Sequence, residues 1–187
     1  MGAHGMIRSI VIQGLFILLI CAIIELSAGS VLTAMEDYLT TLLPGLIVMV
    51  PPLIDLRGNI NGALASRLGT ALHSGVIEPT LKMSAELKIN LASSLILSFI
   101  ASASIGAISY VIAFFSGLQP VNFFALMAIA LIAGFLSGVI LAVITVVIAI
   151  SAYRRGWDPD NVTSPTMATI GDIVTVLCIY LAVLLLG

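Results

Sequence analysis

The sequence predicts an all-α integral membrane protein with five transmembrane helices in each chain. Of its 187 residues, 60% are hydrophobic and only 9% are charged, whereas soluble domains carry about 25% charged residues. The mean hydropathy is +1.24. A chain with so little polar surface cannot cover a water-facing globule of this size, so much of its exterior must face lipid. We therefore expect a multi-pass protein of the cell membrane.

Long apolar stretches mark the expected membrane helices. Each is long enough to cross a bilayer once, which takes roughly 20 apolar residues, and too short to cross it twice. None shows the repeated alternation of apolar and polar residues that marks the strands of a membrane barrel. Together they are expected to form a single membrane domain over residues 1–187. The stretches cover about residues 7–35, 42–75, 89–115, 121–152 and 165–186.

Positive charges in the loops predict how the helices are oriented. These charges alternate with the parity of the helices, and the remaining two loops carry acidic residues or no charge. The positive-inside rule then places the N-terminus in the cytoplasm and the C-terminus outside. The positive residues are Arg8 before the first helix, Lys82 and Lys88 between the second and third, and Arg154 and Arg155 between the fourth and fifth.

A small set of charged residues falls at membrane depth, where each costs about 2.5–3.5 kcal/mol on insertion scales. Such residues are candidates for function by default. Here they are Glu25, Asp55, Arg57, Arg67 and Asp172. We expect Arg57 to be a salt-bridge partner or an anchor that reaches the membrane surface, rather than an ion ligand. For Glu25, binding of an ion or proton and pairing with Arg57 are equally open.

The second apolar stretch carries the most informative residues. Adjacent Pro51 and Pro52 cannot donate backbone hydrogen bonds, so in a continuous helix the carbonyls of Ile47 and Val48 lose their partners. Free carbonyl oxygens are good ligands for hard cations or for their water shells. This segment therefore offers oxygen ligands within the membrane.

A stripe of small and polar residues continues down the same helix. Its members recur at spacings of four and three, which puts them on one face. Such a face cannot lie against lipid, so it must face another helix or water. Close helix packing through Gly58 and Gly62 is one interpretation; for Asp55 with Asn59 we favour the lining of a pore. The stripe consists of Asp55, Asn59, Gly62, Ser66, Gly69 and His73.

The fifth helix is expected to begin at Pro165, capped by Ser164. Asp172 then lies about 10 Å along its axis, on the same face as Thr169. A lone carboxylate there must pair with a cation from another helix, be protonated, or bind a passing ion. The odd number of helices hints at a twofold homodimer, which would bring two copies of Asp172 together. A hydrated Mg²⁺, held by one or two carboxylates with amide and hydroxyl groups nearby, fits that arrangement.

Several other classes of protein are disfavoured by the residues. No basic run suggests a nucleic-acid partner, and Cys21 and Cys178 lack the spacing of a disulfide framework or a thiolate metal site. An intramembrane aspartyl protease needs a GxGD motif, and residues 169–172 lack its first glycine. We therefore expect neither an enzyme nor an organic cofactor. A proton- or Na⁺-coupled carrier of another solute, with the membrane acids as a relay, stays open.

Two parts of the chain carry signature-like motifs. The first comprises residues 50–59 (VPPLIDLRGN) and 64–68 (LASRL). The second comprises residues 158–162 (DPDNV), followed by 164–165 (SP) and 171–172 (GD). These motifs resemble those of the MgtE / solute carrier family 41 divalent-cation transporters, and they are nearer to the solute carrier branch. The resemblance covers essentially the whole chain.

The resemblance implies transport of Mg²⁺ by a twofold pair of such domains, with a pore at or near the dimer axis lined by the second and fifth helices. It implies that Asp172 is the pore aspartate that binds the ion, that Asn59 faces the pore, and that Asn161 lines the pore or shapes the helix entry. Asp55 departs from the pattern, since glycine is common there; the extra acid can add an ion site or pair with Arg57. Because the chain starts almost directly at its first helix, we expect no cytoplasmic regulatory domain.

Overall fold

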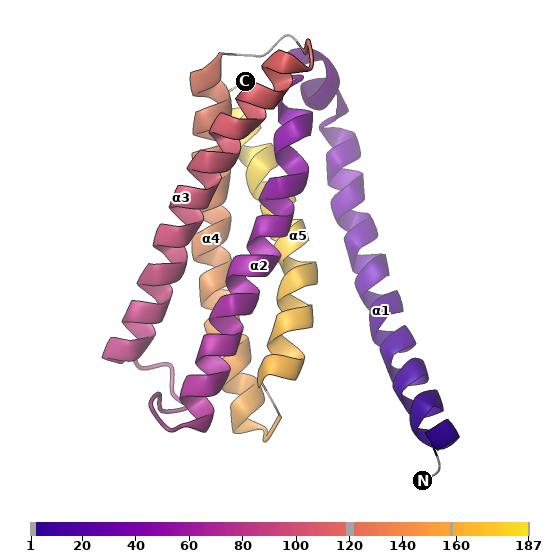
Figure 1. Cartoon of the computed structure of the whole chain (residues 1–187), viewed down its shortest axis with the longest axis vertical. Coiled ribbons are helices and arrows are strands. Elements are labelled where there is room, and N and C mark those ends of the chain that lie inside the picture. Colours follow the sequence, from indigo (N-terminus) through magenta and orange to yellow (C-terminus); the bar gives the residue numbers. More distant parts are fainter. Residues whose placement is uncertain (1–2, 119–121, 158, 187) are drawn as a thin grey trace.

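Within the described residues the chain folds into five long α-helices and no strand, which confirms the all-α prediction (Figure 1). The computed structural model describes residues 3–118, 122–157 and 159–186, apart from the side chains of residues 3–14, 16–18, 160–162 and 164–165. The elements are α1 (Ala3–Ala34), the short π-helix η1 (Tyr38–Leu42), α2 (Leu46–His73), α3 (Ala85–Phe115), α4 (Phe123–Arg154) and α5 (Pro159–Leu186).

The fifth helix begins earlier than the sequence predicts. α5 starts at Pro159 rather than Pro165, so the predicted cap at Ser164 is wrong. A proline suits the first position of a helix, and in α5 that proline is Pro159 rather than Pro165. The helix continues through Pro165, whose missing N–H leaves the carbonyl four residues earlier without its usual donor. Asp172 therefore lies about 20 Å along α5, rather than about 10 Å.

Helices α2 to α5 pack into a bundle, and α1 stands to one side (Figure 1). α5 packs against both α2 and α4, and α3 packs against the same two helices. α1 contacts the bundle mainly along α5. The contact lies toward the C-terminal end of α1, where Ala28 is buried, as is Met35 just after the helix. The α2–α3 and α4–α5 loops lie at the same end of the molecule as the start of α1 (Figure 1).

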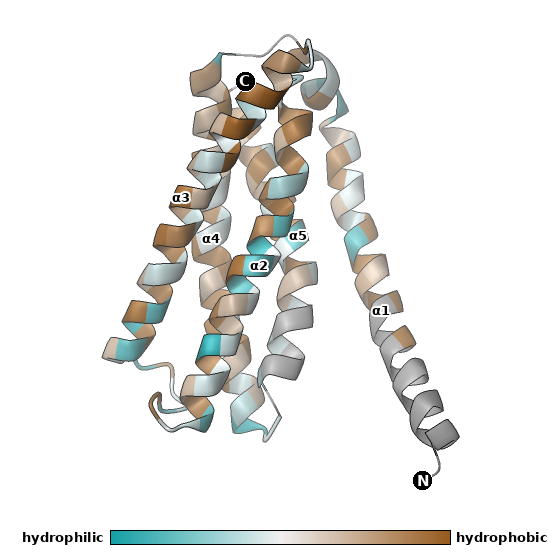
Figure 2. Ribbon diagram, viewed as in Figure 1, coloured by the Kyte–Doolittle hydropathy of each residue, from teal (hydrophilic) through white to brown (hydrophobic). Residues whose placement is uncertain are grey.

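The outer surface of the bundle suits lipid. Among the described residues, three helical segments are long and apolar enough to cross a membrane: Ala85–Phe115, Phe123–Arg154 and Thr166–Leu186. The described apolar part of α1, Leu19–Ala34, is shorter, and α2 carries a hydrophilic band near its middle (Figure 2). Large apolar side chains such as Phe99 of α3 and Phe135 of α4 are exposed. This surface is that of a membrane protein.

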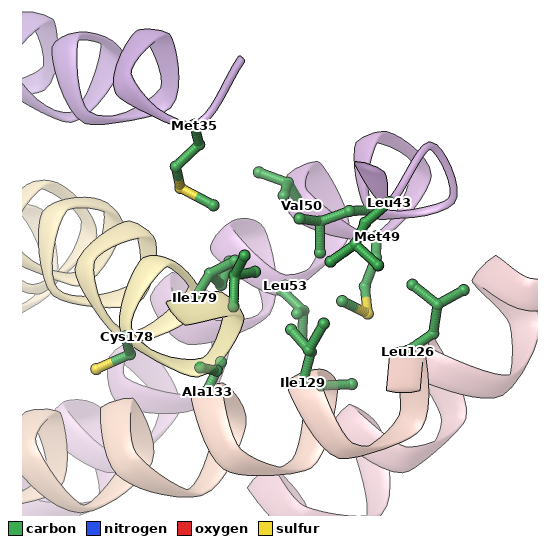
Figure 3. Close-up of a cluster of buried hydrophobic side chains, with 14 residues drawn as sticks. Met35, Leu43, Met49, Val50, Leu53, Leu126, Ile129, Ala133, Cys178 and Ile179 are labelled. Atoms are coloured by element: carbon green, nitrogen blue, oxygen red, sulfur yellow. The ribbon is translucent and has the colours of Figure 1, made fainter. Parts of the chain in front are cut away.

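Two apolar clusters lie toward the two ends of the bundle. The first joins the N-terminal halves of α2 and α4 to the C-terminal half of α5. Met35 points into it, toward Val50 and Ile179 (Figure 3). The second joins the C-terminal halves of α2 and α4, with Ile77 and Leu87 packed beside them. Because lipid is as apolar as these side chains, the clusters hold the helices together by close van der Waals packing.

Between these clusters, α3 and α4 approach each other through small residues. α3 buries a row of serines that includes Ser98 and Ser102, and these face Gly138 and Gly134 of α4. A Cβ at Gly134 would lie 2.6 Å from the Cβ of Ser102, which is closer than real side chains allow. Small residues at such crossings let membrane helices pack backbone to backbone. Glycine is therefore required at position 134.

Replacing Gly134 by alanine is expected to destabilise the bundle by about 1–3 kcal/mol, because overpacking a tight contact forces its neighbours to shift. The thermal unfolding midpoint of the purified protein in detergent should fall below that of the wild type. Gly29→Ala is the matched control, since a Cβ at Gly29 meets no atom within 4 Å and alanine favours the helix. An unfolding midpoint of Gly134→Ala equal to that of the wild type would contradict this packing.

Candidate functional site

A cleft of about 540 Å³ lies between α2 and α5, near the middle of both helices. The hydrophilic band of α2 lies at this level (Figure 2). The polar side chains of the cleft are all ones that the sequence singled out, and the fold brings them together from two helices. The lining residues are Pro51, Ile54, Asp55, Gly58 and Asn59 of α2, and Ala168 and Asp172 of α5.

Asp55 and Asn59 form the polar part of the α2 wall. They are four residues apart, so they share one face of the helix, and Nδ2 of Asn59 donates a hydrogen bond to Oδ2 of Asp55 at 2.9 Å. Both side chains are exposed. Because the bond uses the amide nitrogen of Asn59, the amide oxygen and the second carboxylate oxygen of Asp55 remain available as ligands.

Asp172 faces this wall from α5, and its side chain is half-buried. The two helices come close because their contact is lined by small residues. A Cβ at Gly58 would lie 3.9 Å from the Cα of Ala168. A Cβ at Gly171 would lie 3.9 Å from the backbone nitrogen of Gly58 and 3.8 Å from the Cβ of Arg57. This close approach is what lets carboxylates from α2 and α5 share one cleft.

Glu25 of α1 is not among the residues that line the cleft. It is exposed on that helix. Among the described side chains, no three of histidine, cysteine, aspartate and glutamate are grouped so that they could hold a metal ion.

The two remaining residues predicted for the site are placed differently. Thr169 is buried, with 5% of its surface exposed, and it does not line the cleft. Asn161 belongs to the first turn of α5, but its side chain lies outside the described part of the structure. Of the residues predicted from the sequence, those that meet in the cleft are thus Asp55, Asn59 and Asp172.

Arg57 is neither the ion-pair partner nor the surface anchor that the sequence suggests. Its side chain is fully buried, with 0% exposed, and it extends from α2 toward α3. Its terminal nitrogens donate to the hydroxyl of Ser98 and, at 2.7 Å, to that of Ser102. No carboxylate among the described side chains pairs with it, so neither Asp55 nor Glu25 is its partner. The helix packing decided this outcome, since it put hydroxyls and not acids within reach.

A signal for this arrangement exists in the sequence. Ser94, Ser98 and Ser102 recur every four residues along α3 and are all buried. A row of polar residues on a membrane helix predicts a polar partner on another helix. Which partner it meets depends on how α2 packs against α3, and spacing within one helix does not reveal that.

Polar contacts continue from Arg57 across the bundle. Nδ2 of Asn61 donates to the backbone carbonyl of Arg57 at 2.9 Å, and Oδ1 of Asn61 accepts from Thr145 of α4 at 3.4 Å. The Thr145 hydroxyl also lies 2.7 Å from the carbonyl of Leu141. This polar layer separates the two apolar clusters and ties α2 to both α3 and α4.

The outer face of α2 stays polar beyond the cleft. Of the stripe predicted from residue spacing, Asp55, Asn59, Ser66 and His73 are exposed, whereas Gly69 is buried. In hydrocarbon, each unsatisfied polar group costs several kcal/mol. A polar face of this length therefore faces water or another protein surface rather than lipid tails.

Lipid-facing helices around a cleft with two carboxylates define a membrane transport protein by class, since ionisable residues within membrane helices mark ion or solute pathways. Comparison with known protein families agrees with this class. Residues 50–182 match the model of the MgtE family, which is described as a divalent cation transporter. The chain belongs to this family, whose members are transporters and not enzymes. The family predicted from the motifs is thereby confirmed.

Members of solute carrier family 41 are similar to this chain. Over 137 residues it is 30% identical to solute carrier family 41 member 3 of Rattus norvegicus, an alignment that covers 70% of this chain and 29% of the relative. Over 161 residues it is 30% identical to solute carrier family 41 member 2 of Homo sapiens, covering 80% of this chain and 26% of the relative. The chain thus spans less than a third of the length of these relatives.

The cleft is expected to be accessible to water, which cysteine labelling can measure. In a background with Cys21 and Cys178 replaced by alanine, Asp172→Cys should react with a water-soluble thiol reagent about tenfold faster than Thr169→Cys, or more, because reactivity follows the exposure of the thiol. Thr169 is the matched control, since it lies one turn away on the same helix and is buried. Equal labelling rates at the two positions would contradict a water-filled cleft.

Proposed function

We propose that this chain transports divalent cations, Mg²⁺ above all, across the cell membrane along a path lined by α2 and α5. The observation that carries the proposal is the cleft in which Asp55, Asn59 and Asp172 meet. Carboxylate and amide oxygens are hard ligands of the kind that Mg²⁺ prefers. Membership of the MgtE family supports the same class of substrate.

In this proposal Mg²⁺ enters the cleft with most of its water shell. The ion sheds water reluctantly, and proteins commonly hold it through one or two carboxylates and several waters. A volume of about 540 Å³ leaves room for such waters. Pro51 and Pro52 lie inside α2, so the carbonyls of Ile47 and Val48 have no donor four residues on and can accept hydrogen bonds from the hydrated ion.

A twofold homodimer would complete the path. The polar outer face of α2 needs a protein or water neighbour, and the described side chains of one chain do not group three charged ligands. A second copy, related by a twofold axis, would present the same face and a second Asp172. Two such carboxylates can both stay ionised when a cation lies between them. The pore then lies at or near the dimer axis.

The proposed topology is a single domain with five spans, in which α1 and α2 cross the membrane as well as α3 to α5. The supporting observation is that two loops lie at the same end as the start of α1 (Figure 1). One of them carries Lys82, and the other is flanked by Arg154 and Arg155. By the positive-inside rule, that end faces the cytoplasm.

Asp172→Ala is expected to abolish Mg²⁺ flux in reconstituted liposomes. The rate should fall by about 100-fold or more, because even the loss of a group behind a metal ligand costs about 10–100-fold. Folding should persist, since Asp172 lines a cleft rather than a packed core. Asp37→Ala is the control, because Asp37 is an exposed acid between α1 and η1. Undiminished flux in the Asp172→Ala protein would refute the assignment.

Asn59→Ala is expected to weaken discrimination among Mg²⁺, Mn²⁺, Ca²⁺ and Co²⁺ more than it lowers expression. Asn59 restrains the carboxylate of Asp55 through their hydrogen bond, and selectivity between Mg²⁺ and larger ions depends on the number and rigidity of the ligands. The measurement is Mg²⁺ flux in competition with each of the other ions. Ser66→Ala, farther along the same exposed face, should keep the wild-type order. An unaltered order and ratio of competing ions in Asn59→Ala would count against this role.

A proton- or Na⁺-coupled carrier of another solute is the second candidate. The observation that favours it is the exposed carboxylate of Glu25, which adds a third acid at membrane depth from a separate helix. Chains of acidic residues within membranes can relay protons or bind coupling ions. Flux measured with and without Na⁺ and proton gradients distinguishes the two functions. A rate of Mg²⁺ flux that is the same with and without each gradient would exclude the coupled carrier as the function.

A further inference from the structure

Arg57 is a charged residue that the proposed ion path leaves unused. Among the described residues it is the only charged side chain that is buried. It lies at the level of the cleft, because Asp55 and Asn59 are each two residues away, and Gly171, next to Asp172, packs against its Cβ. Residues two apart in a helix lie on nearly opposite faces. The guanidinium is therefore on the far side of α2 from the cleft, at least one helix diameter, about 10–12 Å, from the carboxylates.

A purely structural link between α2 and α3 would not need this charge. The partners of Arg57, Ser98 and Ser102, are neutral, and a neutral amide could donate to the same hydroxyls. A buried charge without a counter-ion is unfavourable, and Nε of Arg57 is buried with no hydrogen-bond partner. The protein thus keeps a positive charge at a position where a neutral donor would meet the same partners.

Arg67 provides a comparison within the same helix. It also links α2 to α3, donating to Asn90 at 3.0 Å and to Ser94 at 2.8 Å. However, Arg67 is exposed and lies about 15 Å farther along the helix, so solvent screens its charge. The two arginines make similar links and differ in whether the charge is buried beside the cleft.

We infer that the buried charge of Arg57 sets the affinity of the cleft for its divalent cation by opposing the two carboxylates from behind the α2 wall. The inference rests on the proposed function. Two carboxylates that face one cleft attract a doubly charged ion, and transport requires that a bound ion can also leave. Arg57 weakens binding without occupying a ligand position. Ser98 and Ser102 keep its charge at a constant distance.

The test measures Mg²⁺ binding by the purified full chain with isothermal titration calorimetry, alongside Mg²⁺ flux in liposomes. Arg57→Met removes the charge, Arg57→Lys keeps it, and Arg67→Met removes the matched charge away from the cleft. Arg57→Met is expected to bind Mg²⁺ about tenfold more tightly than the wild type, or more, and its flux should saturate earlier at a lower maximal rate. Arg57→Lys and Arg67→Met should bind Mg²⁺ like the wild type.

Unchanged affinity in a folded Arg57→Met protein would overturn the inference, and so would equal tightening in Arg57→Lys or Arg67→Met. If Arg57→Met does not fold, Arg57→Gln replaces it, since glutamine keeps donors for the serines. If both neutral variants fail to fold while Arg57→Lys folds, the charge serves stability and the inference is wrong.

Asp172→Ala separates this inference from the proposed function. A wild-type protein that binds Mg²⁺ no better than Asp172→Ala would overturn the proposed function and the inference with it. Mg²⁺ binding that depends on Asp172, but is the same with and without the charge at Arg57, would overturn the inference alone.

Discussion

The polar middle of α2 is the constraint on which the rest of the structure depends. The middle of this helix carries Asp55, Arg57, Asn59 and Asn61 at membrane depth, where each unsatisfied polar group costs several kcal/mol, so its neighbours must supply partners. α3 supplies the serine hydroxyls that hold Arg57. α4 supplies Gly134 and Gly138, beside which the guanidinium fits. α5 supplies Ala168 and Gly171, whose small size brings the two helices together at the cleft.

Opposite charges lie on opposite faces of α2. Arg57 and Asn61 lie on the inner face, where hydrogen bonds to other helices enclose them. Asp55 and Asn59 lie on the outer face, where they are exposed. The periodicity of the helix produces this separation within seven consecutive residues, 55 to 61. The apolar clusters on either side of the polar layer hold α2 against α4, which gives the cleft a firmly packed wall.

In the proposed ion path, the outer face of α2 supplies ligands for the ion, and the inner face supplies the positive charge that weakens ion binding. Carboxylates from α2 and α5 supply charge without forming a complete set of ligands among the described side chains, which agrees with an ion that keeps water or shares ligands with a second copy. The inner arginine, in turn, offsets part of that charge without reaching the ion. Both features follow from a single helix that must satisfy polar groups on all sides.

The helical class, the membrane setting and the family can be predicted from the sequence, because apolar runs and short motifs are local properties. Spacing also predicted that Asp55 and Asn59 share a face, and a hydrogen bond joins them. The folded chain was needed to show the partners of Arg57, the burial of Thr169 and the start of α5 at Pro159. Side-chain partners and burial depend on which helix faces which. Contacts between residues far apart in the chain set that arrangement, and periodicity within one helix does not encode it.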